Sequence, residues 1–216
     1  DSGLSITKWE LFSGILPPLN ESAWNDYFNQ YKKIPQYKFL NFNMSLNEFK
    51  VIFYWEYVHR VFARFIGLFF LIPLIYFYFS KKIKNNYMNM CYLIFLLILF
   101  QGIIGWYMVK SGLVNDTTVS HYRLSLHLIT AFLIISIIFW LRKNFKLKKN
   151  KVFFNFTSIY FPFQFLIFII YAQIIFGAFV SGLDAGKIYQ TWPLMGENFL
   201  PDDLILKNIS DAFVFE

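Results

Sequence analysis

Long apolar stretches alternate with short polar ones between residues 51 and 180, and this pattern predicts membrane-spanning helices. An α-helix needs about 20 predominantly apolar residues to cross about 30 Å of hydrocarbon. Four stretches meet this requirement, and they predict spans over approximately residues 53–79, 90–109, 124–141 and 154–180. The predicted fold class is therefore an all-α integral membrane protein, a helical bundle with four transmembrane helices.

Residues 1–50 have a different pattern, which predicts an exterior segment with short helices at the membrane interface. Ser22 predicts the start of a helix whose aromatic residues recur at helical spacing and form one apolar face. These residues are Trp24, Tyr27, Phe28 and Tyr31. Ser45 and Glu48 fit a capping box and predict the start of the helix that enters the first span. A linker with amphipathic content is the alternative interpretation.

The composition agrees with a membrane protein, because 57% of the residues are hydrophobic and only 15% are charged, against roughly 25% charged in soluble domains. The net charge of +7 does not indicate a nucleic-acid partner, since basic residues gather in two blocks, Lys81–Lys84 and residues 142–153. Both blocks fall on one side, which the positive-inside rule makes cytoplasmic. Residues 1–50, the loop 110–123 and residues 181–216, where a further segment starts, are then exterior.

The chain has one cysteine, Cys91, so an intrachain disulfide is excluded. It begins with Asp1 rather than Met and stops where a further apolar segment starts, so we expect a piece of a longer protein. A weak internal repeat also runs through it, and repeats commonly place ligand sites in corresponding positions. The repeat pairs Gln101, Gly105 and Ser111-Gly112-Leu113 with Gln173, Gly177 and Ser181-Gly182-Leu183.

Two of the three histidines, His59 and His127, lie at the mouths of predicted spans. Ionisable groups at the edge of a membrane segment are costly, so each is a candidate functional residue. The predicted topology places both on the exterior side. Two neutral imidazoles on neighbouring helices are what a haem iron needs as axial ligands.

Charged residues surround these histidines. Glu56 shares a helix face with His59 and Arg60, so it can orient the imidazole or act with it. Arg64 lies deeper in the apolar run and needs a partner such as Glu56 or a ligand carboxylate. Arg123 lies one turn before the histidine of the third span. The plainer interpretation is an interfacial Glu56–Arg60 pair beside an uninvolved His59.

His121 is a rival ligand on grounds of depth. At 1.5 Å per residue, His59 lies about 33 Å from Lys81, whereas His127 lies about 22 Å and His121 about 31 Å from Arg142. Helix tilt, or a first helix that protrudes inside, would remove the mismatch for His127. His121 lies in a polar loop, where a solvated histidine is the commoner case.

Several strings of the sequence resemble haem A synthases of the proteobacterial and mitochondrial type, and the resemblance covers nearly the whole chain. The other bacterial type carries a cysteine pair in an outer loop, which this chain lacks. The matching strings are Asp1 to Trp9, Ile15 to Asn20, Trp55-Glu56-Tyr57-Val58-His59-Arg60, Gln101 to Leu113, Tyr122-Arg123-Leu124 with His127, and Gly182 to Gly196.

The resemblance implies an eight-helix protein in two pseudo-symmetric four-helix halves, of which this chain would hold helices two to five. Residues 51–141 would belong to the N-terminal half, and 154–180 would be the first helix of the C-terminal half. The family oxidises the ring D methyl group of haem O to a formyl group and so makes haem A for cytochrome c oxidase. A haem b cofactor would bind to later helices that this chain lacks.

The resemblance also implies roles for residues. His59 and His127 would bind the iron of the substrate haem O, and Glu56 would accept a proton. Arg60, Arg64 and Arg123 would pair with the propionates or support the site. The expected partners are membrane lipid, the haem O synthase that supplies the substrate, an electron acceptor that the sequence does not identify, and further copies in a homo-oligomer.

The expected location is the bacterial cytoplasmic membrane or the mitochondrial inner membrane, with both chain ends on the non-cytoplasmic side. Two alternative functions use the same residues differently. A bis-histidine b-type membrane cytochrome would pass electrons through a stable haem without modifying it, and the residues alone favour this class. A transporter or assembly scaffold would bind no haem.

Overall fold

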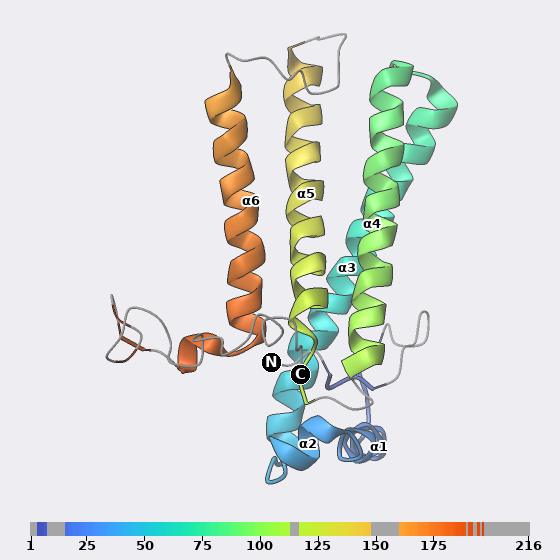
Figure 1. The fold of residues 1–216 in the computed structure, drawn as a ribbon. Helices are drawn as coiled ribbons and strands as arrows, with labels where there is room; N and C mark the ends of the chain where they lie inside the picture. Colours follow the sequence, from blue (N-terminus) through green and yellow to red (C-terminus); the bar gives the residue numbers. More distant parts are fainter. Residues whose placement is uncertain are drawn as a thin grey trace.

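The computed structural model describes residues 4–7, 16–112, 117–147, 160–188, 190–191, 194 and 196. These residues form helices and connecting turns without a β-strand, which confirms the predicted all-α class (Figure 1). In chain order the helices are α1 (Glu21–Tyr31), α2 (Pro35–Phe39), α3 (Leu46–Ser80), α4 (Asn85–Gly112), α5 (His121–Lys146), α6 (Phe161–Gly182) and the short 3₁₀-helix η3 (Ala185–Lys187).

Four helices, α3 to α6, are long and apolar enough to cross a membrane. Each packs against the next along the chain, α3 on α4, α4 on α5 and α5 on α6, and neighbours run in opposite directions (Figure 1). In this view α3 is inclined relative to the other three helices. The chain is an integral membrane protein, and the predicted number and order of its spans are confirmed.

The ends of the spans differ from the predicted bounds. α3 begins at Leu46, where the predicted capping box starts the helix, and so before the apolar run that was predicted to span from about residue 53. α5 runs from His121 to Lys146 rather than over 124–141, so the predicted loop 142–153 begins later. Its last turn carries Lys143 and Lys146, which suit the partial negative charge of a helix C-terminus.

The fourth span begins at Phe161 and ends at Gly182, instead of covering 154–180. Pro162 lies in its first turn, where the missing amide proton costs no helical hydrogen bond. Residues 154–159 of the predicted span lie outside the described residues.

The described part of the segment before α3 forms α1 and α2, and α1 packs onto α3. The helix α1 begins at Glu21 rather than Ser22, because the side chain of Asn20 accepts a 2.8 Å hydrogen bond from the amide of Ala23. The predicted capping box at Ser45 is confirmed by reciprocal bonds with Glu48.

The predicted apolar face of α1 packs in a buried aromatic cluster between α1 and α3. Its aromatic members are Trp24, Phe28, Tyr31, Phe49 and Phe53. The hydroxyl of Tyr31 donates to Gln36 at 3.0 Å and accepts from Asn41 at 2.8 Å, and burial raises the pKa of Tyr31.

Hydrogen bonds of polar side chains connect neighbouring spans. Tyr171 of α6 donates a 2.7 Å hydrogen bond to the hydroxyl of Ser136 on α5. Tyr87 of α4 donates to the backbone oxygen of Asn144 on α5 at 3.1 Å. Bonds of this kind between transmembrane helices contribute on average about 0.6 kcal/mol each. They also fix the register of the helices that carry the candidate site.

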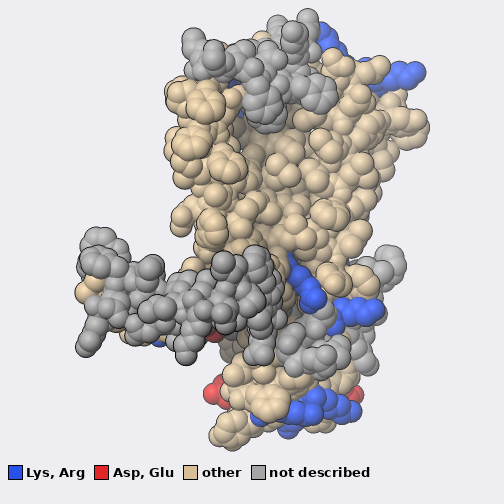
Figure 2. All heavy atoms as spheres, viewed as in Figure 1, with Lys and Arg blue, Asp and Glu red and all other residues tan. Residues whose placement is uncertain are grey.

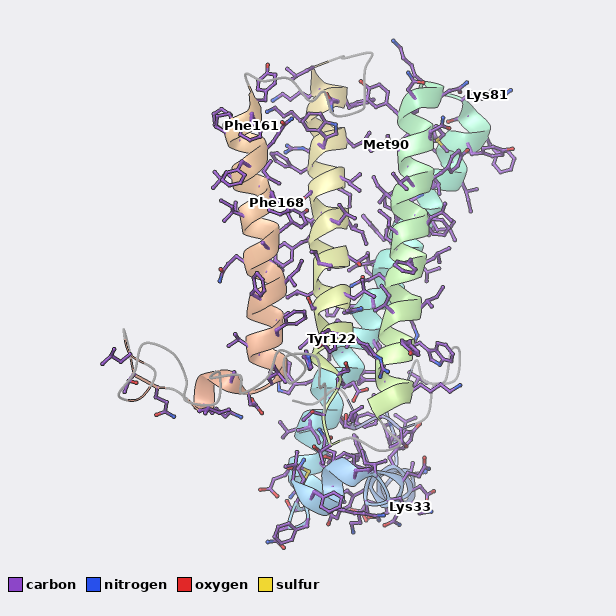
Figure 3. The ribbon with its side chains drawn as sticks, in the orientation of Figure 1. Lys33, Lys81, Met90, Tyr122, Phe161 and Phe168 are labelled. Atoms are coloured by element: carbon purple, nitrogen blue, oxygen red, sulfur yellow. The ribbon has the colours of Figure 1, made fainter. Side chains whose placement is uncertain are left out.

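The surface separates into charged ends and an uncharged belt. Figure 2 shows Lys, Arg, Asp and Glu gathered towards the two ends of the face drawn, with an uncharged band between them. Large apolar side chains on the spans are exposed, including Phe69 on α3 and the labelled Phe161 and Phe168 on α6 (Figure 3). An apolar belt of this kind is suited to contact with lipid.

Candidate functional site

The histidines singled out by the sequence lie on two different spans, His59 on α3 and His127 on α5. Their imidazoles are near enough for His59 to act electrostatically on His127. The helix between them in sequence, α4, packs against both α3 and α5. The inclination of α3 (Figure 1) agrees with helix tilt as the reason why a count along straight helices gave different depths.

The two imidazoles have different surroundings. His59 is exposed, whereas the ring of His127 is partly buried against α4. A Cβ atom built on Gly105 would lie 3.3 Å from Cε1 and 3.8 Å from Nδ1 of His127. The absence of a side chain at Gly105 therefore lets α4 approach the Cε1 and Nδ1 atoms of the ring closely. Glycine is common where a backbone must come near another group.

The backbone of His127 is also held by α4. The side-chain amide of Gln101 donates a 2.8 Å hydrogen bond to the carbonyl oxygen of His127. Gln101 and Gly105 are one helical turn apart, so they share a face of α4, and both meet the same residue. Both residues belong to the predicted internal repeat, but the sequence predicted no contact between them and His127.

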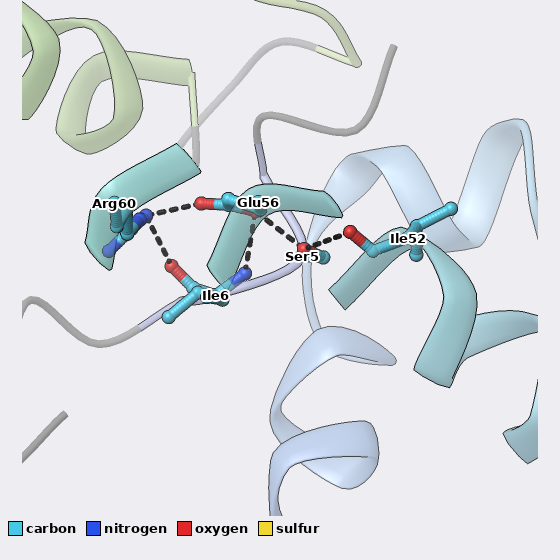
Figure 4. Close-up of polar contacts among 5 residues, drawn as sticks. All are labelled: Ser5, Ile6, Ile52, Glu56 and Arg60. Carbon is cyan, nitrogen blue, oxygen red and sulfur yellow. Dashed lines mark hydrogen bonds and ion pairs between the residues drawn. The ribbon is translucent and has the colours of Figure 1, made fainter. Parts of the chain in front are cut away.

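Glu56 is buried and lies at the centre of a polar cluster that joins α3 to the chain's N-terminal segment (Figure 4). Its Oε2 accepts from the hydroxyl of Ser5 at 2.5 Å and from the amide of Ile6 at 3.1 Å. Its Oε1 pairs with the guanidinium of Arg60. Arg60 also donates to the carbonyl oxygen of Ile6 at 3.2 Å. We call this group the Glu56 cluster.

The Glu56 cluster confirms that Glu56 and Arg60 share a face and an ion pair, as their spacing predicts. Both carboxylate oxygens take hydrogen bonds that fix residues 5 and 6, so one role of the pair is to dock the N-terminal segment. Ser5 and Ile6 were not among the predicted site residues. No local signal could have identified them, because they lie about 50 positions from Glu56.

The remaining arginines lie on the same two spans as the histidines. Arg64 is partly buried on α3, where it interacts electrostatically with Arg60 and Tyr57. Arg123 lies near the start of α5, with its guanidinium 4.6 Å from the ring centroid of Tyr107 on α4. The first turn of α5 thus carries a cation that lies against the aromatic ring of a residue on α4.

His121, the rival ligand, packs towards α6 instead of α3. A Cβ atom at Gly182 would lie 2.7 Å from the Cβ and 2.9 Å from the Cα of His121. The imidazole ring lies 5.6 Å, centroid to centroid, from Phe179 of α6. These contacts give His121 a packing role where α5 begins and α6 ends, near the labelled Tyr122 in Figure 3.

The loop after α6 is described only in part. Asp184 and Lys187 form an exposed 2.9 Å ion pair in it. Tyr189, Trp192, Pro193 and Met195, which belong to the string matched to the family, lie outside the described residues.

The residues present fit a haem iron better than a bare metal ion. Among the described residues, no group of three or more His, Cys, Asp or Glu side chains could hold a metal ion. A haem supplies the equatorial ligands itself and needs only axial ones, which two imidazoles provide. The close approach of Gly105 to the His127 ring agrees with a ring held in place for such a bond.

Comparison with known proteins gives a consistent result. The family model described as "Cytochrome oxidase assembly protein" matches residues 1–215. The chain is 55% identical over 212 residues to a haem A synthase of Pelagibacter ubique, covering 94% of this chain and 60% of the relative. It is 45% identical over 207 residues to a haem A synthase of Rickettsia canadensis, covering 93% and 60%.

A haem A synthase of Bartonella quintana is 44% identical over 213 residues, covering 96% of this chain and 58% of that protein. The chain therefore spans about 60% of the length of the curated relatives it matches. No solved structure matches it.

Proposed function

The chain belongs to the cytochrome oxidase assembly protein family, and from this membership and the site geometry we propose that the full-length protein is a haem A synthase. The proposed reaction oxidises the ring D methyl group of haem O to a formyl group: one oxygen atom enters from water, four protons are released, and an electron acceptor takes up the four electrons removed. The observation that carries the proposal is the placement of His59 and His127 on two spans that both pack against α4, in a chain whose relatives bear this name.

His59 and His127 bind the iron of the substrate haem O in this proposal. Their position on two spans that both pack against α4 would hold the porphyrin between helices. Binding at the iron would fix the plane of the macrocycle, and binding of the propionates would stop its rotation about the axial bonds, so that one methyl group stays in a constant place relative to the protein. Such positioning is the main contribution that binding residues make to a difficult oxidation.

Positive charge supports the propionates of the substrate. Arg64 and Arg123 lie on the same two helices as the iron ligands, and Arg60 lies one residue after His59. Guanidinium groups bind carboxylates through paired hydrogen bonds, so these three residues are the proposed propionate partners. Arg60 divides its donors between this role and the Glu56 cluster.

Glu56 is the proposed proton acceptor, because it is the carboxylate on the turn of α3 next to His59. Its oxygens accept three bonds, from Ser5, Ile6 and Arg60, and a carboxylate has about four lone-pair sites, so Oε1 keeps a site for a proton. The haem b cofactor of the family would bind to helices outside this chain, and haem O would come from a haem O synthase. The proposed location is the bacterial cytoplasmic membrane, or the mitochondrial inner membrane, with the site on its outer side.

The test uses the full-length protein, produced in cells that make haem O but lack a haem A synthase of their own. Extracted haem is separated and identified by mass. We expect haem A with the wild type, and loss of both haem O retention and haem A with His127→Ala and His59→Ala. Haem that stays bound and chemically unchanged would instead support a b-type cytochrome. A folded protein without haem would support a scaffold.

A further inference from the structure

The helix α4 meets His127 at two points that differ in chemistry. The amide nitrogen of Gln101 donates to the carbonyl oxygen of His127 at 2.8 Å, and the backbone at Gly105 lies against the imidazole ring. One face of α4 thus holds both the main chain and the side chain of a proposed iron ligand. Apolar packing alone would not require Gln101 here, since placing an amide side chain within a membrane span costs free energy.

Two polar atoms at this contact have unmet hydrogen-bonding capacity. Nδ1 of His127 and Oε1 of Gln101 are both buried, and neither has a hydrogen-bond partner among the described residues. Buried polar atoms are nearly always paired, and each unpaired one costs stability. The two atoms are complementary, because an amide oxygen only accepts, whereas Nδ1 donates when the neutral ring presents Nε2 to a metal.

We infer that Gln101 is a positioning residue for His127: its Oε1 accepts the Nδ1 proton through one bridging water molecule, and so fixes the tautomer that presents Nε2 to the haem iron. This inference rests on the proposed function. Metal-binding histidines almost always donate their second N–H to a carboxylate, a carbonyl or water, which orients the ring and strengthens it as a ligand. In this chain the amide of Gln101 supplies that acceptor.

The Gln101 bond to the carbonyl of His127 makes the side chain rigid. With Nε2 of Gln101 held by that carbonyl, Oε1 cannot rotate away freely. One turn further along the same face of α4, Gly105 limits the ring, because any shift of the imidazole towards α4 meets the helix. His127 is thereby the fixed ligand of the pair, while the exposed His59 has more freedom to adjust to a substrate that must enter and leave.

The experiment measures haem affinity, ferric low-spin spectrum and midpoint potential in the full-length protein. The haem signal that disappears in His127→Ala defines this site. Gln101→Met keeps the volume but removes the acceptor, whereas Gln101→Glu keeps an oxygen that accepts more strongly. Thr130→Val is the matched control, because the hydroxyl of buried Thr130 bonds only to Leu126 of its own helix among the bonds found.

We expect Gln101→Met to weaken haem binding by about 10–100-fold and to raise the midpoint potential, since a less basic imidazole stabilises ferric iron less. Gln101→Glu should shift the potential downwards from the Met variant, and Thr130→Val should leave both values unchanged. Equal shifts in the same direction for Met and Glu, or wild-type values for Met, would overturn the inference. A His127→Ala protein that keeps its full haem signal would instead overturn the proposed site itself.

A second pair of variants keeps the inference testable if Gln101 variants fold poorly. Gly105→Ala places a methyl group 3.3 Å from Cε1 of His127, so the ring must shift by a few tenths of an ångström. Gly102→Ala places one where no atom lies within 4 Å. We expect a changed ferric spectrum for Gly105→Ala only. Identical spectra for both variants would show that α4 does not position the ring.

Discussion

At the scale of single residues, the site combines two kinds of polar contact with different consequences. Glu56 binds three donors from its own helix and from the N-terminal segment, so its environment is that of a docking residue as well as of a proposed proton acceptor. His127 has the opposite character, with a held backbone and a ring nitrogen that has no partner among the described residues. The oxygens of Glu56 take their bonds from the protein, whereas the Nδ1 of His127 is left for the proposed contact with Gln101 and its Nε2 for the proposed haem iron.

The two roles of Glu56 can be separated with Glu56→Gln and Ser5→Ala in the full-length protein. Glutamine can still accept bonds from Ser5 and Ile6 but cannot serve as the proposed base. We therefore expect Glu56→Gln to retain haem O and to slow its conversion to haem A, measured by timed haem extraction.

Ser5→Ala is the control, because it removes a donor and leaves the carboxylate in place. Losing a hydrogen bond to a charged group costs about 1.5–3 kcal/mol, so limited proteolysis should cut the N-terminal segment faster while conversion stays near the wild-type rate. Unchanged conversion in Glu56→Gln would remove its catalytic role. Equal slowing in both variants would reduce that role to docking.

At the scale of helices, glycine decides how closely the spans approach. Gly105 admits α4 to the ring of His127, and Gly182 admits the end of α6 to the backbone of His121. Small residues at such contacts are typical of membrane helices, where close backbone packing contributes much of the association. By contrast, Gly177 has no atom within 4 Å of its position for a Cβ. The glycines of one helix are therefore not equivalent.

This difference gives a prediction for α6. Gly182→Ala would place Cβ 2.7 Å and 2.9 Å from two atoms of His121, one of them backbone, so the helices must separate. Overpacking of this kind costs about 1–3 kcal/mol. We expect a lower thermal unfolding midpoint in detergent than for the wild type. Gly177→Ala, the matched control on the same helix, should be neutral or slightly stabilising. Equal midpoints for the two variants would contradict the packing described for α5 and α6.

At the scale of the whole molecule, hydropathy was sufficient for the order of the spans but not for their ends. The α5 helix runs to Lys146 because a basic last turn is compatible with helix, which an apolar window does not detect. The position of His59 and His127 towards the same end of the bundle could be predicted, since the predicted topology puts both residues on one side of the membrane. The contacts of Gln101 and Ser5 could not, because they depend on helix register and on a chain segment that returns from far away in sequence.

The sequence also predicts the orientation of the bundle in the membrane, and single-cysteine labelling tests this prediction. In a full-length protein freed of cysteines, including Cys91, one cysteine is introduced at Lys33, Lys82 or Lys187, which are all exposed. Lys82 follows α3, whereas Lys33 and Lys187 lie beyond the opposite ends of the spans. A membrane-impermeant maleimide should label Lys33→Cys and Lys187→Cys in intact cells, and Lys82→Cys only after lysis, because positive loops stay inside. Labelling of Lys82→Cys alone in intact cells would invert the topology and would place the proposed haem site on the cytoplasmic side.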